Sequence, residues 1–288
     1  MSPPSVSKPT RSPAEDGALR ELVRRALSED RADEDITTRG TVPTESFGRA
    51  HLVAREPCIV AGLEAFRAVM LEVGSNLGIE LRVADGDAVA AGTRVATVEG
   101  SLRSILTAER TALNFVQHLS GVATLTRAFV DAAGGVEVRD TRKTTPGLRG
   151  LEKAAVRAGG GVNHRHDLAS AVLIKDNHIA AAGGIAAAVQ GARRMTSDAS
   201  VEVECDTLDE VREAVEAGVD EVLLDNMDVR TMRRAVELAR GRCRTEASGG
   251  ITLEGVADVA KCGVDAISVG ALTHSARAID LALEVEAA

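Results

Sequence analysis

The sequence predicts an α/β protein whose larger part is a parallel sheet with helices between its strands. After Gly134, short apolar runs typical of buried strands recur, and helical patterns lie between most of them. The repeat is about 20–35 residues long, which implies parallel strands in a β/α barrel or a doubly wound sheet. The residue count fits six or seven units rather than eight. The candidate strands are Val136–Arg139, Ala171–Ile174, Val201–Val203, Glu221–Leu224, Arg244–Glu246 and Ala266–Val269.

A smaller α+β unit is expected ahead of this repeat. Residues 1–14 hold four of the seven prolines of the chain and predict a disordered leader. The expected elements that follow are a helix over residues 18–28, one or two strands over 47–60, a helix over 62–73 and short strands over 79–98.

A long helical pattern over residues 104–132 comes next, with two shorter helices broken at Gly121 as an alternative. One face of this pattern is polar, at Arg110, Asn114, Gln117 and Gly121. Such a stripe is most often a solvent-exposed face. It is also expected where a helix faces a binding site or a partner subunit.

Composition excludes several classes of protein. The formal net charge is -9 and the chain has four Phe but no Tyr or Trp, so neither duplex binding nor base stacking is expected. No apolar run approaches the ~18–20 residues of a membrane span. The four cysteines show no C-x-x-C spacing, and no signal segment is visible. This pattern favours a cytoplasmic protein without disulfides or a zinc site.

One stretch departs from the acidic character of the chain. Residues 140–178 contain seven Lys or Arg against four Asp or Glu, a local charge of +3. The stretch opens with Asp140–Arg149, where Asp140, Thr144 and Thr145 are expected to shape the loop. A basic centre in an acidic protein indicates a small anionic ligand, although a solvated loop gives the same pattern.

In a β/α barrel, the catalytic groups lie at the carboxyl ends of the strands. Charged or glycine-rich residues follow every predicted strand, and such regularity is difficult to obtain by chance. In chain order they are Asp140, Arg142 and Lys143; Lys175, Asp176, Asn177 and His178; Glu204; Asp225 and Asn226; Ser248, Gly249 and Gly250; and Gly270.

Two of these groups suit a sugar phosphate. The glycine-bearing loops at residues 248–251 and 269–271 can hold a phosphate through their backbone N–H groups. Glu204 and Asp225 can bind ribose hydroxyls or Mg²⁺ on a diphosphate, and they can also stabilise positive charge on a sugar.

The cations suit a second, acidic substrate. Arg142, Arg165 and Lys175 can bind carboxylates, and the two guanidinium groups can do so with two hydrogen bonds each. Three histidines add candidate donors or bases without the spacing of a zinc site, namely His164, His166 and His178.

Several long motifs together resemble those of the quinolinate phosphoribosyltransferase family, whose enzyme is also called nicotinate-nucleotide pyrophosphorylase (carboxylating). They occur in the family's order and extend over residues 18–285. The motifs are Glu109–Asn114, Asp140–Arg149, Gly159–Arg165, Leu173–Ile179, Val201–Glu204, Leu223–Met227, Glu246–Ile251 and Ser268–Ser275. Ala154 stands where the family usually has an aromatic residue, which concerns local packing more than chemistry.

The resemblance implies an incomplete, about seven-stranded β/α barrel with an N-terminal α/β sandwich domain. The implied boundaries are a leader over residues 1–14, the sandwich domain over 15–118 joined by residues 276–288, and the barrel over 119–275. It also implies at least a homodimer, in which Arg110 reaches into the neighbouring subunit's site.

The implied activity is phosphoribosyl transfer from phosphoribosyl pyrophosphate to quinolinate with decarboxylation. It gives nicotinate mononucleotide, pyrophosphate and CO₂ in de novo NAD biosynthesis. Lys143, Glu204 and Asp225 are the implied catalytic residues, with Mg²⁺ carried mainly by the diphosphate near the two carboxylates. The implied substrate-binding residues are Arg110, Thr141, Arg142, Lys143, His164, Arg165, Lys175, Glu204, Asp225, Ser248, Gly249, Gly250, Val269, Gly270 and Ala271.

Three other functions fit parts of the same pattern. Lys175 or Lys143 at a strand end could form the Schiff base of an aldolase. A non-catalytic barrel could sense an acidic ligand, although a sensor has no need of Glu204 and Asp225. Nicotinate could replace quinolinate, although the number of cations favours a dicarboxylate.

Overall fold

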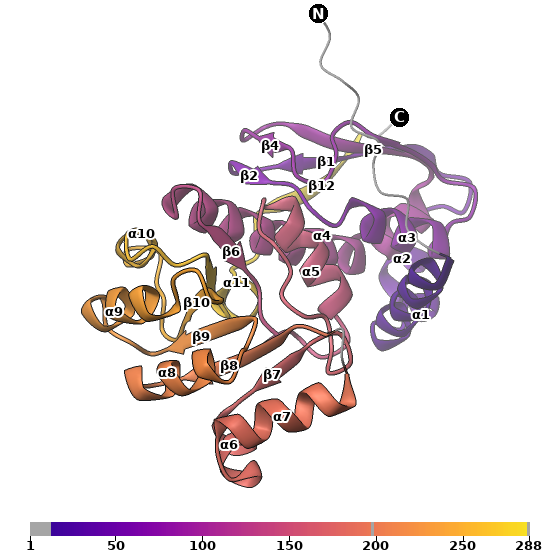
Figure 1. Cartoon of the computed structure of the whole chain (residues 1–288). Coiled ribbons are helices and arrows are strands. Elements are labelled where there is room, and N and C mark those ends of the chain that lie inside the picture. The colour runs from indigo at the N-terminus through magenta and orange to yellow at the C-terminus, as the bar shows by residue number, and fades with distance from the viewer. Residues whose placement is uncertain (1–12, 197–198, 287–288) are drawn as a thin grey trace, which may run out of the picture. The chain divides into compact units, whose positions relative to one another are not determined.

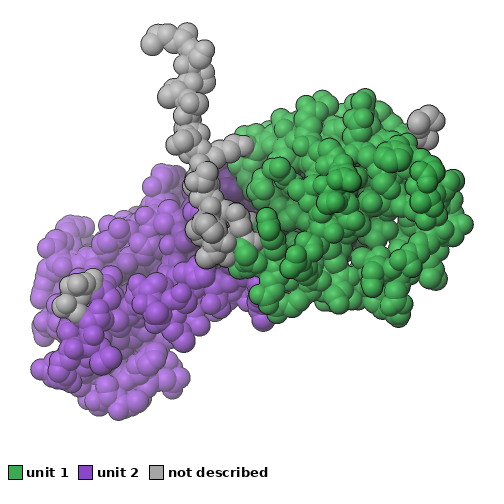
Figure 2. Space-filling view, turned by 90° about the vertical axis from the view of Figure 1, so that its right-hand side faces the viewer, with its two compact units in different colours: residues 1–118, 279–288 green, residues 119–278 purple. Residues whose placement is uncertain are grey.

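The computed structural model describes residues 13–196 and 199–286, in which the chain divides into two compact units. One unit holds the residues up to His118 and those from Ile279 on, and the other holds Leu119–Ala278; Figure 2 colours them separately. Most of the leader expected over residues 1–14 lies outside the described residues. Its last two residues already belong to helix α1 (Pro13–Glu29).

A four-stranded antiparallel sheet in the order β12-β1-β5-β3 forms the centre of the first unit (Figure 1). Strand β1 (Phe47–Ala54) pairs with β5 (Arg94–Ser101) on one side and with β12 (Leu281–Glu286) on the other. Strand β3 (Gly78–Leu81) lies at the far edge, beside β5. The last described strand of the chain thus belongs to the same sheet as the first.

Short elements and two helices complete this unit. Helix α1 buries Leu19, Val23 and Leu27 at helical spacing and contacts α3 (Leu63–Val73). Asp35 caps the short helix α2 because its side chain accepts the N–H of Thr38 at 2.9 Å. The remaining elements are η1 (Ala32–Glu34), α2 (Ile36–Thr41), β2 (Cys58–Ile59) and β4 (Ala88–Val89), the last two paired with each other.

The predicted long helix is continuous, as α4 (Leu102–Ala132), so the alternative of a break at Gly121 is wrong. A Cβ at this position would overlap the carbonyl oxygen of Arg277, so the glycine allows close backbone approach instead. Gln117 Nε2 donates to the carbonyl oxygen of Leu281 at 2.7 Å. Two positions of the polar stripe therefore face the chain's own C-terminal segment rather than solvent or a partner.

The second unit is built on a six-stranded parallel sheet in the order β6-β11-β10-β9-β8-β7 (Figure 1). All six predicted strands are confirmed, with small differences at their ends. They are β6 (Glu137–Arg139), β7 (Val172–Ile174), β8 (Val201–Cys205), β9 (Glu221–Asp225), β10 (Arg244–Ser248) and β11 (Ala266–Ser268).

The first and last strands of this sheet are neighbours, since β11 pairs with β6. Within the described residues, no strand pairing joins β6 to β7. Val162 makes one isolated parallel bridge to Arg139 of β6, so the sheet has six strands and a single bridge where a seventh strand was expected. The structure thus shows a six-stranded parallel sheet in which the first strand in the sequence lies beside the last.

Helices connect the parallel strands, as the spacing predicted. They are α5 (Arg149–Ala158), α6 (Asp176–Ala182), α7 (Ile185–Met195), α8 (Leu208–Glu216), α9 (Val229–Ala239), α10 (Val256–Ala260) and α11 (Ala271–His274). Helix α10 is shorter than the pattern over residues 253–261 indicates, because Thr252 forms a turn with Gly255 at its start. No helix in the described ranges is both long and apolar enough to cross a membrane.

Candidate functional site

Alternation along the parallel strands brings polar side chains to one face of the sheet. On β8, Val201 and Val203 are fully buried, while Glu202 and Glu204 point to the opposite face because strand side chains alternate. By the same alternation, Leu223 and Asp225 share one face of β9, and Glu246 and Ser248 share one face of β10. The strands therefore present acidic and hydroxyl groups together near their carboxyl ends.

A pocket of about 320 Å³ is lined by these side chains and by the loops that follow the strands. The structure brings nine of the expected binding residues together here: Thr141, Arg142, Lys143, His164, Arg165, Lys175, Glu204, Asp225 and Ser248. Four unpredicted residues, Leu173, Leu223, Glu246 and Ser268, also line it. Residues 249–250 and 269–271 directly follow two of the lining serines.

Two guanidinium groups form the cationic side of the pocket. Arg142 Nε is buried without a hydrogen-bond partner. Burial and the positive charge of Arg142 lower the pKa of Arg165. Lys175 Nζ forms an ion pair with Glu204 Oε2. Neighbouring cations with an unsatisfied buried N–H form a site suited to an anion.

Lys143 is held at the pocket by hydrogen bonds to its backbone and by the close approach of its side chain to a glycine. The hydroxyl of Thr273 donates to the carbonyl oxygen of Lys143 at 2.9 Å, and Thr141 Oγ1 accepts the Lys143 N–H at 3.0 Å. A Cβ on Gly270 would lie 3.0 Å from Lys143 Cδ, so the lysine side chain passes close over the glycine. The lysine and the 269–271 loop therefore lie side by side.

The loop after β10 depends on a glycine with positive φ. Gly249 has φ +89, and a Cβ there would overlap Asn226 Oδ1 and lie 2.6 Å from Asn226 N. Asn226, itself at φ 52, donates its N–H to the Ser248 carbonyl oxygen at 3.0 Å. Its Nδ2 donates to Asp225 Oδ2 at 2.6 Å. One asparagine thus joins the glycine loop to the Asp225 carboxylate.

The expected loop-shaping residues of the basic stretch have structural partners. Asp140 is fully buried and accepts hydrogen bonds from Lys153 Nζ, Asn163 Nδ2 and the His164 N–H. Thr144 Oγ1 accepts from Arg149 Nε at 3.1 Å, and the Thr145 N–H donates to Glu152 Oε2 at 3.0 Å. Lys153 lies in the basic stretch of the sequence, but it is buried against Asp140 and does not line the pocket.

Of the three candidate histidines, the structure places His164 in the pocket and the other two elsewhere. His178 Nδ1 accepts the N–H of Lys175 at 3.0 Å as part of the cap of α6. His166 is exposed, and its Nδ1 lies 3.5 Å from Asp167 Oδ2. These two contacts are local, and neither His178 nor His166 lines the pocket.

Sequence reasoning missed a buried polar network beneath the pocket. Arg139 Nη1 is ion-paired with Glu246 Oε2 and with Glu221 Oε1, the latter at 2.9 Å. Ser268 Oγ donates to Glu246 Oε1, and His164 Nε2 lies 3.0 Å from Glu202 Oε2. Burial, together with the charge of Glu202, raises the pKa of Glu246. Strand alternation could have revealed two of these residues. Glu202 and Glu246 precede Glu204 and Ser248 by two residues, so each pair lies on the same face of its strand.

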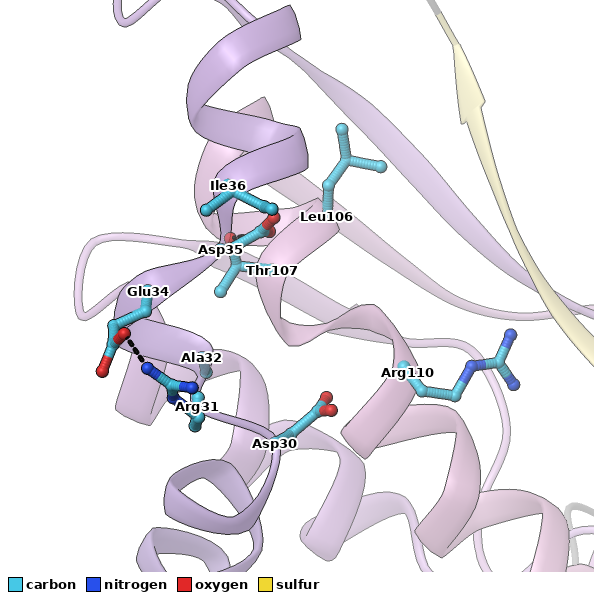
Figure 3. A pocket seen from close by; sticks show the side chains of 9 residues that line it. All are labelled: Asp30, Arg31, Ala32, Glu34, Asp35, Ile36, Leu106, Thr107 and Arg110. Carbon is cyan, nitrogen blue, oxygen red and sulfur yellow. Dashed lines mark hydrogen bonds and ion pairs between the residues drawn. The ribbon is translucent and has the colours of Figure 1, made fainter.

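Arg110 lies in the first unit, outside the pocket just described. It is exposed and lines a separate pocket of about 450 Å³ together with Asp30, Asp35 and Thr107. Figure 3 shows its guanidinium group pointing away from Asp30 and Asp35. Asp35 is engaged locally, since Thr107 Oγ1 donates to its Oδ2 at 2.9 Å.

The parallel sheet and the pocket at its strand ends define an α/β protein with a pocket whose cations suit an anionic ligand. The family described as quinolinate phosphoribosyl transferase, C-terminal domain, matches residues 122–284, and the corresponding N-terminal domain matches residues 35–120. The chain therefore belongs to the quinolinate phosphoribosyltransferase family.

Individual relatives agree with this assignment over nearly the whole chain. A nicotinate-nucleotide pyrophosphorylase [carboxylating] of Mycobacterium leprae is 44% identical, covering 95% of this chain and 99% of the relative. A mitochondrial quinolinate phosphoribosyltransferase [decarboxylating] of Nicotiana glauca is 42% identical, covering 97% and 85%. The solved nicotinate-nucleotide pyrophosphorylase of Francisella tularensis superposes with a TM-score of 0.91 at 42% identity, covering 98% of this chain and all of that one.

Proposed function

We propose that this protein is the pentosyltransferase of its family, acting on quinolinate and phosphoribosyl pyrophosphate with decarboxylation. The products are nicotinate mononucleotide, pyrophosphate and CO₂, in de novo NAD biosynthesis. The observation that carries the proposal is the composition of one pocket. There, Arg142 with its unpartnered buried Nε and Arg165 occur together with Lys143 and the carboxylates of Glu204 and Asp225.

The two guanidinium groups are assigned to quinolinate, which carries two adjacent carboxylates on a pyridine ring. Arg142 and Arg165 would bind them with charge-assisted hydrogen bonds, which also satisfies the buried Arg142 Nε. Lys175 and His164 add positive and polar contacts at the same end, and Leu173 offers apolar surface to the ring. Holding the ring in one orientation aims its nitrogen at the sugar.

The phosphoribosyl end is assigned to Lys143, Ser248 and the two glycine-bearing loops. Backbone N–H groups at residues 249–250 and 270–271 would bind phosphate oxygens, since these positions carry little side-chain bulk. The Val269 N–H already donates to the Arg139 carbonyl oxygen at 2.9 Å, so Val269 would only line the loop. Lys143 lies beside Gly270 and can donate to the diphosphate. Thr141, which accepts the Lys143 N–H, completes this part of the site.

The reaction then needs charge stabilisation rather than a general base. The ring nitrogen of quinolinate carries no proton and attacks the anomeric carbon as the bond to pyrophosphate breaks. Glu204 and Asp225 stabilise the positive charge that develops on the ribose. Afterwards the electron pair of the breaking carbon–carbon bond stays on the ring carbon, where the adjacent cationic nitrogen stabilises it. The neighbouring carboxylate leaves as CO₂, and the ring carbon takes a proton from water.

The carboxylates near Asp225 fit Mg²⁺ carried by the diphosphate. The carboxylates of Glu204 and Asp225 both line the pocket. Crowded carboxylate oxygens are the ligands this ion prefers, and it would neutralise the departing pyrophosphate. Glu204 and Asp225 would lie near the ion-bearing diphosphate.

Three further features belong to the same proposal. The sheet would be an incomplete barrel, with Val162 in the position of a seventh strand. Two copies would form a homodimer in which the exposed Arg110 completes the neighbouring site. A cytoplasmic location is consistent with four free cysteines, because a reducing compartment keeps thiols unpaired.

The function is tested by one assay. Purified protein is incubated with quinolinate, phosphoribosyl pyrophosphate and Mg²⁺, and both nicotinate mononucleotide and pyrophosphate are followed. We expect equal amounts of the two products, and much slower turnover when nicotinate replaces quinolinate, because it lacks the second carboxylate. Folded protein that forms no product, or that prefers nicotinate, contradicts the assignment. Omission of Mg²⁺ tests the metal separately.

A further inference from the structure

Asn226 follows β9 at the point where the chain leaves the parallel sheet. Strand β9 ends at Asp225, which pairs in register with Ser248, the last residue of the neighbouring strand β10 (Figure 1). The Asn226 N–H donates to the Ser248 carbonyl oxygen at 3.0 Å. Asn226 has φ 52, and among the described residues only Arg31 is another non-glycine with positive φ. Asparagine adopts this conformation more readily than most residues do, so the turn can place its side chain without large strain.

The side chain of Asn226 contacts two parts of the site at once. Its Nδ2 donates to Asp225 Oδ2 at 2.6 Å. On its other side, a Cβ on Gly249 would overlap the Oδ1 and lie 2.6 Å from the Cγ, so the amide packs directly against the glycine backbone. The nitrogen must face the carboxylate, because two acceptor oxygens at that distance would repel each other. One side chain therefore links the carboxylate to the loop that carries Gly249.

Asp225 relies on this contact for its orientation. In the part of the chain that the structure describes, the Asn226 amide is the one hydrogen-bond donor to its carboxylate. Glu204, the other carboxylate assigned to the ribose, is held differently, by its ion pair with Lys175. A neutral donor orients Asp225 without cancelling its charge, which leaves that charge available to a cationic sugar.

Asn226 does not line the pocket, so it can act on a substrate only through the groups it holds. Those groups are assigned to two parts of one molecule, Asp225 to the ribose and the 249–250 loop to a phosphate. Moving either group would change the distance between them. A ligand that carries both a ribose and a phosphate is bound well only when that distance is maintained.

We propose that Asn226 is a positioning residue for phosphoribosyl pyrophosphate: its side chain aims the Asp225 carboxylate at the ribose and keeps the 249–250 loop at a fixed distance from it. The identity of the ligand rests on the function proposed above. Quinolinate is assigned to other residues of the pocket, so Asn226 affects the binding of one substrate and not of the other. A residue that only maintained the turn would be replaceable by glycine.

Asn226→Gly separates the side chain from the turn, because glycine accepts φ 52 and keeps the backbone N–H that binds Ser248. We expect thermal unfolding near the wild-type midpoint. KM for phosphoribosyl pyrophosphate should rise by about tenfold or more, as for a lost hydrogen bond to a charged group. KM for quinolinate should stay within about twofold of the wild-type value. An unchanged KM for phosphoribosyl pyrophosphate, or an equal rise of both constants, overturns the proposal.

Asn226→Asp keeps the shape of the side chain and exchanges the donor for a carboxylate oxygen that faces Asp225. Two facing carboxylates share one proton in acid and repel each other once both are ionised. KM for phosphoribosyl pyrophosphate, variant over wild type, should therefore rise with pH, and the ratio cancels the titration of the substrate. It also cancels that of the other charged groups around Asp225, which are Lys143 after β6, Lys175 after β7, Glu204 and Asp206 at β8 and Glu246 on β10.

The control for an added charge is Asn76→Asp, since Asn76 is exposed in a turn of the first unit. Its ratio to wild type should not change with pH. A ratio that stays constant in Asn226→Asp, or the same slope in both variants, overturns the proposal. This comparison decides alone if Asn226→Gly unfolds.

Binding separates this inference from the proposed reaction. Wild type and Asn226→Gly are titrated calorimetrically with phosphoribosyl pyrophosphate and Mg²⁺ in the presence of benzene-1,2-dicarboxylate, which has both carboxylates but no ring nitrogen to attack. We expect the variant to bind about tenfold more weakly or worse. Equal affinities sink the role of Asn226 alone, and a wild type that binds the ligand but forms no nicotinate mononucleotide sinks the reaction alone. A wild type that binds no phosphoribosyl pyrophosphate overturns both.

Discussion

Lys153 Nζ donates a hydrogen bond to Asp140 Oδ1 across 2.5 Å, and the two side chains have 1% and 0% of their surface exposed. Asp140 also accepts from Asn163 Nδ2 at 2.6 Å and from the His164 N–H at 2.9 Å. Burial raises the pKa of Asp140 even though Lys153 opposes the shift. The pair thus ties the end of β6 to α5 and to the loop that carries His164.

Replacement of Lys153 by methionine should destabilise the protein by about 3–5 kcal/mol, because it leaves the Asp140 carboxylate buried without its cation. Urea-induced unfolding measures the loss. Lys261→Met is the matched control, since Lys261 is 69% exposed and pairs with Asp258 on the surface at 3.0 Å. We expect that control to change stability by less than about 0.5 kcal/mol. Equal losses in both variants would show that the buried pair has no special role.

The features of the fold and the site that could be predicted are those that a short stretch of sequence determines. Glu204 and Asp225 were predicted because the apolar runs locate the carboxyl ends of the strands, which is where the functional groups of a β/α barrel lie. The Arg139–Glu246 contact was not predicted, because its residues are far apart in sequence and meet only through strand order. The reason for a glycine at position 121 was equally hidden, since it makes room for the backbone of Arg277.

Arg142→Ala should raise KM for quinolinate, because one charge-assisted contact contributes about 1.5–3 kcal/mol, or roughly tenfold to a hundredfold in affinity. KM for phosphoribosyl pyrophosphate should stay near the wild-type value. Arg149→Ala is the control from the same basic stretch, because its Nε binds Thr144 and it does not line the pocket. Steady-state kinetics decide between them, and an unchanged KM for quinolinate in Arg142→Ala would remove that residue from the site.

The two glycines after β10 should respond differently to alanine. Gly249→Ala places a Cβ against Asn226 at φ +89, so about 2 kcal/mol or more of stability and tight binding of phosphoribosyl pyrophosphate should be lost. Gly250 has φ +60 but open space around the added Cβ, so Gly250→Ala should cost about 1 kcal/mol. Thermal unfolding and KM for phosphoribosyl pyrophosphate test both. The reverse order of effects would contradict the role given to the Asn226 contact.

Stability should depend on pH through His164. Its pKa is raised in the folded state, so the stability it contributes is complete below the unfolded value of 6.5 and is lost as pH rises through the folded value. The difference in unfolding free energy between wild type and His164→Asn should therefore shrink as the pH is raised from about 6.5 upward. Urea titrations across that range measure it, with exposed His166→Asn as the control. A constant difference would show that His164 does not hold its proton.

Arg110 offers a test of subunit assembly that activity alone cannot give. It is exposed in the first unit, and Lys143 lies in the second, so each can be removed separately. We expect Arg110→Ala and Lys143→Ala to be nearly inactive alone. If Arg110 completes the neighbour's site, a mixed dimer has one intact site, and an equal mixture refolded together should regain about a quarter of wild-type activity. Light scattering establishes the dimer. No recovery in a confirmed mixed dimer would place Arg110 in its own subunit's site, because each site would then lack one residue.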